Sequence, residues 1–292
     1  MERLRISTRD QLRTLLVLGR ASNLPTVWSN CIAGWILGGE GPLSGLVLLL
    51  FGGTFLYVGG MYLNDAFDAE FDRQHRPERP IPSGAITLGE VWGLGVGWLV
   101  LGTVLLAIFG PITFFLTILL LASIITYDVV HKAMAFSPII MALCRFFLFL
   151  VASSAGDEGV TGLAIWTSFA LALYIVGLSY VAKSESTRGV LRYWPCWLLA
   201  APLLLAYLVN HGAYRQPSML LGAVLAFWIL RNLRFTFWSG EKNIGRTVSG
   251  LLAGIVLVDL LALAGGQNPF ITIGFVLLFG AALLFQRFIP PT

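Results

Sequence analysis

Charged residues and cysteines are scarce in this sequence, and each shortage excludes a class of protein. Only 12% of the 292 residues are Asp, Glu, Lys or Arg, roughly half the share of about 25% that soluble domains carry. Together with 57% hydrophobic residues, 20 Phe and 9 Trp, this composition excludes a water-soluble enzyme, a disordered chain and a nucleic-acid-binding module. The three cysteines, Cys31, Cys144 and Cys196, stand alone in apolar segments, so they form no metal-binding spacing and no disulfide framework.

The N-terminus also lacks the short apolar core and small-residue cleavage site of a signal peptide. Residues 1–20 instead interleave five arginines with leucines. This pattern favours an amphipathic helix over residues 1–19 that lies on the membrane surface.

Long apolar runs fill most of the remaining sequence. A bilayer core of about 30 Å requires roughly 20 apolar residues per helix, and ten segments come close to this length. They are 20–38, 43–65, 88–109, 111–128, 134–152, 160–182, 192–210, 217–236, 247–265 and 270–288. The sequence therefore predicts an all-α, multi-pass protein of the lipid bilayer, with residues 1–292 forming a single domain.

Basic residues provide a test of this count. If the N-terminus is cytoplasmic, alternating spans place 17 of the 19 Lys and Arg residues inside, Arg215 outside and Arg145 within a span. Cytoplasmic loops are expected to carry such an excess. We therefore predict ten spans with both termini in the cytoplasm, in a bacterial inner membrane.

Acidic residues gather at the end of the second predicted span. Asp65, Asp68, Glu70 and Asp72 fall within eight residues directly after an apolar run, where charges are costly unless they are used. Asn64, Asp68 and Asp72 are four residues apart, so they stack on one helical face, with Asp65 close to that face and Glu70 pointing away. Carboxylate and amide oxygens without His or thiolate suit a hard ion, Mg²⁺ above all.

Arginines and prolines follow the acidic residues directly. Mg²⁺ uses one or two carboxylates, keeps water ligands and takes phosphate oxygens from a substrate, and Arg76 and Arg79 are close enough in sequence to hold those oxygens bidentately. Pro80, Pro82 and Gly84 stiffen and turn the loop. A solvated loop of mixed charge is the alternative interpretation. Such loops rarely place carboxylates four residues apart after an apolar helix, so the pattern favours a Mg²⁺–phosphate site.

Three motifs resemble those of one family, the UbiA-type intramembrane prenyltransferases. The most specific is the run N-D-x-x-D-x-x-x-D at 64–72, continued by R-P-I-P-S-G at 79–84. The stretch R-A-S-N at 20–23 is similar to the Arg-x-x-Asn of the family's first helix, and Tyr127 and Lys132 are similar to its Tyr…Lys element. The resemblance covers about residues 15–265 and implies a UbiA-like bundle of nine spanning helices, so segment 270–288 is an addition and the total is nine to ten.

The resemblance also implies an activity: Mg²⁺-dependent transfer of a prenyl group from a polyprenyl diphosphate to a hydrophobic or aromatic acceptor. Asn64, Asp68 and Asp72 would bind Mg²⁺, and Asp68 and Asp72 would be the catalytic pair. Ionising an allylic diphosphate requires charge stabilisation on the leaving group, which metal and cations supply. The substrate-binding candidates are Asn23, Arg76, Arg79, Tyr127, Lys132, Arg145, Lys183 and Glu185.

The family's second aspartate-rich motif is degenerate in this chain. In residues 180–188 only Glu185 is acidic, while Lys183 and Arg188 are basic. Either the two basic residues contact the diphosphate in place of a second metal, or Glu185 completes a weaker site, or ionisation is lost; a basic cytoplasmic loop explains them equally well. Together with the stretch at 22–30 and the run L-C-R at 143–145, this pattern resembles the EboC-like branch of the superfamily. The alternative function is a non-catalytic membrane protein that binds or transports an isoprenoid or its product.

Other polar residues near or within the spans invite local interpretations. Arg145 and Asp259 lie deep in their segments, and we predict that they face each other or share a polar pocket, because buried charges pair or line cavities. Arg145 then either binds a substrate carboxylate or phosphate or forms an ion pair between helices. Asp128 either binds metal or, as we expect, pairs with Lys132 four residues later. We interpret His131 as a solvated loop residue.

Overall fold

The computed structural model describes residues 8–132, 134–186, 193–239, 242–264 and 268–290. These residues form helices and connecting loops, and no strand occurs among them. In chain order the elements are α1 (Thr8–Leu18), the 3₁₀ turn η1 (Ala21–Asn23), α2 (Leu24–Leu37), α3 (Leu43–His75), α4 (Leu88–Ala107), α5 (Pro111–Val130), α6 (Ser137–Ser154), α7 (Gly162–Ser186), α8 (Trp194–Leu198), α9 (Ala201–Val209), the 3₁₀ turn η2 (Gly212–Tyr214), α10 (Arg215–Phe237), α11 (Ile244–Ala262) and α12 (Pro269–Phe285). The all-α class is confirmed.

The predicted spans correspond in order to α2 through α12, with one interruption. Segment 192–210 is divided into α8 and α9, because Pro202 lies in the first turn of α9, where a proline starts a helix rather than continues one. Seven of the described helices are long and apolar enough to cross a membrane, whereas the stretch Trp194–Val209 and α12 are shorter. The count of nine to ten spans is therefore approximate.

α3 is the element that positions the acidic residues. It runs unbroken for 33 residues, continuing about ten residues past the apolar segment that ends at 65. The helix ends at His75, since Arg76 precedes Pro77 and a residue before proline is pushed out of the helical region. The acidic face is thus held rigidly on the same helix that crosses the membrane.

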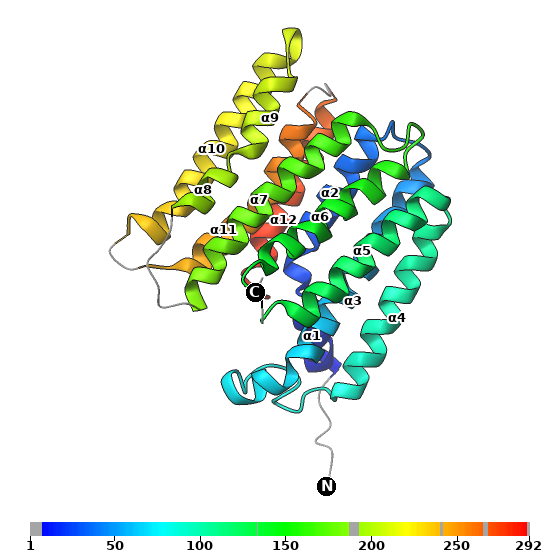
Figure 1. Ribbon diagram of the computed structural model, residues 1–292, viewed down its shortest axis with the longest axis vertical. Helices are drawn as coiled ribbons and strands as arrows, with labels where there is room; N and C mark the ends of the chain where they lie inside the picture. Colours follow the sequence, from blue (N-terminus) through cyan, green and yellow to red (C-terminus); the bar gives the residue numbers. More distant parts are fainter. Residues whose placement is uncertain (1–7, 133, 187–192, 240–241, 265–267, 291–292) are drawn as a thin grey trace.

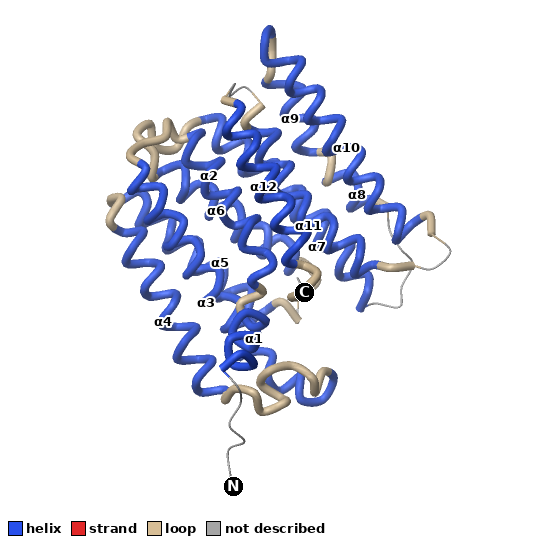
Figure 2. Tube along the Cα trace, turned by 180° about the vertical axis from the view of Figure 1, so that it is seen from behind, coloured by secondary structure: helices blue, strands red, loops and turns tan. Residues whose placement is uncertain are grey.

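Helix α2 lies at the centre of the bundle, where it packs against α3, α6, α11 and α12. On one side of this centre lie α3, α4 and α5, and on the other lie α8, α9 and α10 (Figure 1). The tube seen from behind shows the same grouping (Figure 2). The C-terminal end of the described chain lies beside η1, where the Ser22 hydroxyl donates to the carbonyl oxygen of Pro290 at 3.5 Å. The C-terminal end of the described chain and the start of α2 therefore lie at the same end of the bundle.

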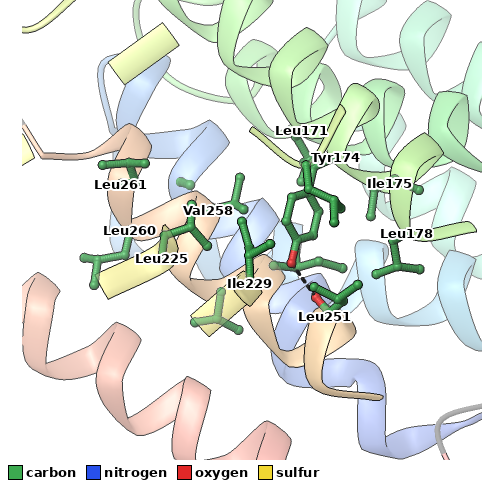
Figure 3. Close-up of a cluster of buried hydrophobic side chains, with 14 of the residues drawn as sticks. Leu171, Tyr174, Ile175, Leu178, Leu225, Ile229, Leu251, Val258, Leu260 and Leu261 are labelled. Carbon is green, nitrogen blue, oxygen red and sulfur yellow. Dashed lines mark hydrogen bonds between the residues drawn. The ribbon is translucent and has the colours of Figure 1, made fainter. Parts of the chain in front are cut away.

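The largest apolar core lies between α7, α10 and α11 (Figure 3). Tyr174 is fully buried there and its hydroxyl donates to the carbonyl oxygen of Leu251 at 2.9 Å. The approach requires Gly254, because a Cβ at that position would be 2.6 Å from the Tyr174 hydroxyl. This core joins the C-terminal helices to α7 and leaves the acidic end of α3 on the opposite half of the bundle.

Candidate functional site

The four polar residues predicted to share one face of α3 do so. Asn64, Asp65, Asp68 and Asp72 are buried, with between 2% and 8% of their surface exposed. Glu70 points outward and pairs with Arg73 at 2.7 Å on the exposed side of the helix. The helical period thus predicted correctly which carboxylates turn inward.

Two arginines from separate elements meet this face. Arg20 donates from Nη2 to Asn64 Oδ1 at 3.0 Å and to Asp65 Oδ1 at 3.4 Å. Arg79, in the loop after α3, donates from Nη1 to Asp65 Oδ1 at 3.0 Å and reaches Asp72 Oδ2 at 3.5 Å. Asp65 is therefore held between two guanidinium groups.

Arg20 reaches the acidic residues from a strained backbone. Its φ of 42° and ψ of 50° lie in the left-handed region, which costs a residue other than glycine of order 1–3 kcal/mol. This conformation joins α1 to η1 and directs the guanidinium at Asn64 and Asp65. Strain of this kind persists where the surrounding contacts fix it, and here those contacts are the site itself.

A second pair of basic groups comes from the end of α5. Lys132 Nζ lies 2.6 Å from Asp68 Oδ1 and His131 Nε2 lies 3.3 Å from the same oxygen. His131 Nδ1 lies 3.1–3.2 Å from the carbonyl oxygens of Tyr127 and Asp128, so both ring nitrogens face acceptors. Burial alone lowers the pKa of His131, but its hydrogen bond to Asp68 and the charge of that carboxylate outweigh burial and raise the pKa.

Asp128 does not pair with Lys132, contrary to the expectation from their spacing. Its Oδ1 instead accepts a hydrogen bond from Asn64 Nδ2 at 3.1 Å. The reason is tertiary: α3 packs against α5, so the Asp68 carboxylate is nearer to Lys132 than the local partner is. Asp128 is thereby a fifth oxygen-bearing member of the site. We name Asn64, Asp65, Asp68, Asp72 and Asp128 the acidic cluster.

Two oxygens of the acidic cluster are buried without any partner. Asp72 Oδ1 and Asp128 Oδ2 are fully enclosed and accept no hydrogen bond from any of the described residues. Buried carboxylate oxygens are normally satisfied, so these atoms mark positions at which a further ligand is accommodated. In the described part of the chain, no three His, Cys, Asp or Glu side chains converge on a ready-made metal position.

The remaining predicted residues divide between the cluster and its surroundings. Asn23 is buried in η1, and the Tyr127 ring stacks on that of His131 at 5.1 Å between centroids. Arg76 is exposed in the loop after α3. Lys183 donates to the carbonyl oxygen of Met134 at 2.9 Å and so contacts the loop between α5 and α6.

Two residues of the degenerate second motif cannot be placed against the site. Arg188 and the side chain of Glu185 lie outside the described residues. The predicted roles of both residues stay predictions.

Arg145 and Asp259 share one polar network, as predicted, but they do not form a direct ion pair. Asn30 of α2 lies between them: its Oδ1 accepts from Arg145 Nη1 at 2.7 Å and its Nδ2 donates to Asp259 Oδ2 at 2.6 Å. Ser29 donates to the same Asp259 oxygen at 2.5 Å. Arg145 also donates to the backbone oxygen and the hydroxyl of Thr26, at 3.0 and 2.9 Å.

Three members of the site received no binding or catalytic role from the sequence: Arg20, Asp65 and His131. Arg20 opens the Arg-x-x-Asn motif, and Asp65 lies close to the predicted face, so both carried a usable signal. His131 carried only its position beside Lys132. A lone histidine in a loop is commonly solvated, and only the packing of α5 against α3 brings it to Asp68.

A bundle with several membrane-crossing helices, whose buried carboxylates meet basic side chains at one end, defines an integral membrane protein with a site for charged ligands. The sequence profile of the UbiA prenyltransferase family matches residues 23–243. The chain belongs to this family, and it is accordingly a prenyltransferase and a multi-pass membrane protein. Its cytoplasmic termini, its EboC-like branch and its bacterial inner membrane stay predictions.

Known relatives agree with this membership. Digeranylgeranylglyceryl phosphate synthase of Metallosphaera sedula is 25% identical over 252 residues, which are 77% of this chain and 84% of that protein. The synthase of the same name from Ignicoccus hospitalis is 38% identical over 103 residues, 35% of this chain and 34% of that protein.

Solved structures share the fold. A structure of digeranylgeranylglyceryl phosphate synthase in membranes superimposes with a TM-score of 0.65 at 23% identity, covering 88% of this chain and 98% of that one. A UbiA homologue from Archaeoglobus fulgidus bound to GPP and Mg²⁺ superimposes with a TM-score of 0.62 at 16% identity, covering 86% of this chain and 98% of the other. At these identities the likeness concerns the fold alone.

Proposed function

We propose that the acidic cluster binds Mg²⁺ and the diphosphate of a prenyl donor, and that the protein transfers the prenyl group to an acceptor inside the membrane. The observation that carries the proposal is the pair of buried, unpartnered oxygens, Asp72 Oδ1 and Asp128 Oδ2, in a cluster contacted by four basic side chains. The relative bound to GPP and Mg²⁺ shares this fold and supports the choice of ligands.

The residues present fit a magnesium ion. The acidic cluster offers carboxylate and amide oxygens, which Mg²⁺ prefers. Two oxygens of the cluster, Asp72 Oδ1 and Asp128 Oδ2, have no hydrogen-bond partner among the described residues. Asn64, Asp68 and Asp72 would hold the ion, in agreement with the helical spacing. When bound, Mg²⁺ acts as a Lewis acid that stabilises the charge of the departing diphosphate.

Basic residues of this chain would bind the diphosphate itself. Arg20, Arg79 and Lys132 carry the positive charge nearest to the cluster, and guanidinium and ammonium groups bind diphosphate oxygens by charge-assisted hydrogen bonds. Because the same groups contact the carboxylates, they are already positioned at the place where the diphosphate charge develops. Arg76, exposed beside them, is assigned to the capture of incoming diphosphate.

The contacts also imply that metal and diphosphate bind together. Lys132 contacts Asp68 and Arg79 contacts Asp72, two of the residues proposed to hold Mg²⁺. If these carboxylates held a metal ion, Lys132 and Arg79 would lose their present partners and would become available to bind the diphosphate. Each ligand thus removes the cost of binding the other, so we expect positive coupling between them.

Lys183 is better assigned to positioning than to replacing a second metal. Its ammonium group donates to the backbone oxygens of Met134 and Ala135 and to the Ser137 hydroxyl, at 2.9 to 3.5 Å. These residues lie two to five positions after Lys132. Lys183 thereby fixes the loop that carries Lys132 to Asp68, and a role of Glu185 in diphosphate binding stays a prediction.

A test of the function uses the protein in lipid nanodiscs with Mg²⁺, geranylgeranyl diphosphate and a membrane extract as the source of acceptor. Wild-type protein is expected to release diphosphate, and Asp68→Ala is expected to abolish the release while the protein stays folded. Glu70→Ala is the matched control, since this carboxylate lies on the exposed side of the same helix. Equal release by wild type and Asp68→Ala contradicts the assignment.

The second candidate function is a non-catalytic carrier of an isoprenoid or its product. It is favoured by the second-motif region, because residues 180–183 hold no carboxylate and Lys183 contacts a loop instead. The same assay separates the two functions. Binding of geranylgeranyl diphosphate without any release, with and without extract, would establish the carrier.

A further inference from the structure

A second polar centre lies deeper in the bundle, around Arg145. This residue follows the start of α6 at Ser137 by eight residues, which is about 12 Å along a helix. Its guanidinium group is directed toward α2 and α3 and remains only partly buried, although it is far from either end of the bundle. An arginine at this depth is costly unless it has a function.

Arg145 retains hydrogen-bonding capacity after all its protein contacts are counted. Arginine has five N–H donors, and the contacts to Thr26 and Asn30 use both on Nη1 and one on Nη2. The Nε–H and the second Nη2–H have no acceptor among the described residues. Nε and Nη2 share one edge of the guanidinium plane, and two parallel N–H groups on an edge match the two oxygens of a carboxylate or phosphate.

The charge of Arg145 is also incompletely matched. Asn30 lies between Asp259 and the guanidinium, and Asp259 Oδ1 is buried with no hydrogen-bond partner in the described part of the chain. If Arg145 and Asp259 served only to connect their helices, the carboxylate would be expected in direct, bidentate contact with the guanidinium group. Here the amide of Asn30 holds the arginine in place and leaves one edge of it available.

The Arg145 guanidinium lies on the side of α3 that also carries the acidic cluster, at a greater depth in the bundle. The Tyr57 ring lies 5.8 Å from the Arg145 guanidinium, and the Tyr57 hydroxyl donates to the backbone oxygen of Arg20 at 3.4 Å. Tyr57 precedes Asn64 by seven residues on α3, about 10 Å deeper along that helix. A prenyl donor held at the cluster by its diphosphate presents its reactive carbon toward this depth, so a second substrate anchored at Arg145 faces that carbon.

We infer that Arg145 anchors the acceptor, and that the acceptor carries a carboxylate or phosphate group bound by the Nε–H and Nη2–H edge of this arginine. The inference rests on the proposed function, since it places the acceptor relative to the diphosphate. Asn30 acts as a positioning residue and Asp259 as the buried counter-charge. The anion also offsets the guanidinium charge next to the carbon that becomes positive during transfer.

The experiment measures binding of small probes to the protein in nanodiscs by calorimetry, with no turnover needed. Benzoate and phenyl phosphate represent the two anions, and benzamide is the neutral control of benzoate. We expect at least one anion to bind about tenfold more tightly than benzamide, because a charge-assisted hydrogen bond is stronger than one between a guanidinium group and a neutral amide. Whichever anion binds more tightly identifies the group on the acceptor.

Variants and competition locate the probe. Arg145→Gln is expected to remove the preference for the anion over benzamide, and Arg145→Lys to restore it only in part, since lysine keeps the charge without the paired donors. Mg²⁺ with pyrophosphate should bind alongside the probe. Displacement of the probe by pyrophosphate would place it at the acidic cluster and overturn the inference.

Two outcomes separate this inference from the proposed function. Equal binding of benzoate, phenyl phosphate and benzamide by wild-type protein overturns the role of Arg145, and this comparison holds even if Arg145→Gln fails to fold. Failure of wild-type protein to bind pyrophosphate with Mg²⁺ instead overturns the function proposed for the acidic cluster. The two failures are read from different probes and are therefore distinct.

Discussion

Removing the ammonium group of Lys132 is expected to change two affinities in opposite directions. In Lys132→Met, Asp68 loses its contact at 2.6 Å, so Mg²⁺ alone should bind more tightly. Lys132 is 38% and Asp68 11% exposed, and a pair this accessible is worth no more than about 1 kcal/mol. The gain for Mg²⁺ is therefore about fivefold at most. Pyrophosphate in the presence of Mg²⁺ should bind roughly tenfold more weakly, because a charge-assisted hydrogen bond is lost.

Calorimetry on the protein in nanodiscs measures both affinities. Arg73→Met is the matched control: it removes a cation next to the same stretch of α3, but Arg73 pairs with the exposed Glu70 and both groups are more than half exposed. We expect neither affinity to change in this control. Weaker binding of Mg²⁺ alone to Lys132→Met would refute the exchange of partners, since a lysine that merely supports the local fold would weaken both ligands.

Two further predictions concern the helix packing that supports the site. Gly95→Ala should destabilise the protein by about 1–3 kcal/mol through overpacking, because a Cβ there would be 2.7 Å from the Leu63 side chain. Gly93→Ala is the matched control: a Cβ there meets open space, so the substitution should stabilise α4 by up to about 1 kcal/mol. Equal shifts in melting temperature for the two variants would contradict this packing. Tyr174→Phe removes the hydrogen bond to Leu251 and should lower the stability of the protein by about 1 kcal/mol, while diphosphate release is retained. A thermal melt measures the first effect and the release assay measures the second.

The order of the helices and the inward face of α3 were both predictable from the sequence. Apolar runs of membrane-spanning length are a local property, and the four-residue spacing of Asn64, Asp68 and Asp72 fixes a common face wherever the helix forms. The division of segment 192–210 into α8 and α9 was harder to predict from the sequence. Its cause, Pro202 in the first turn of α9, looks in the sequence like a proline that only bends a continuous span.

The partners of the charged residues were decided by the tertiary structure. Asp128 and Lys132 are four residues apart and suit a local pair, yet each finds its partner on α3. His131 gave no signal in the sequence because its role depends on Asp68, which is more than sixty residues away in the chain. The same holds for Arg145 and Asp259, whose shared network depends on Asn30 from a third helix.

The sequence by itself determined that this chain crosses a membrane and that it gathers oxygen-bearing side chains on one helical face, since hydropathy and helical period act between near neighbours. Only the packing of α2, α3, α5 and α6 decided which basic group meets which carboxylate and which edge of Arg145 remains available. The physical reason is that hydrogen bonds and ion pairs depend on distances of a few ångströms, and those distances are set by how helices remote in sequence lie against one another.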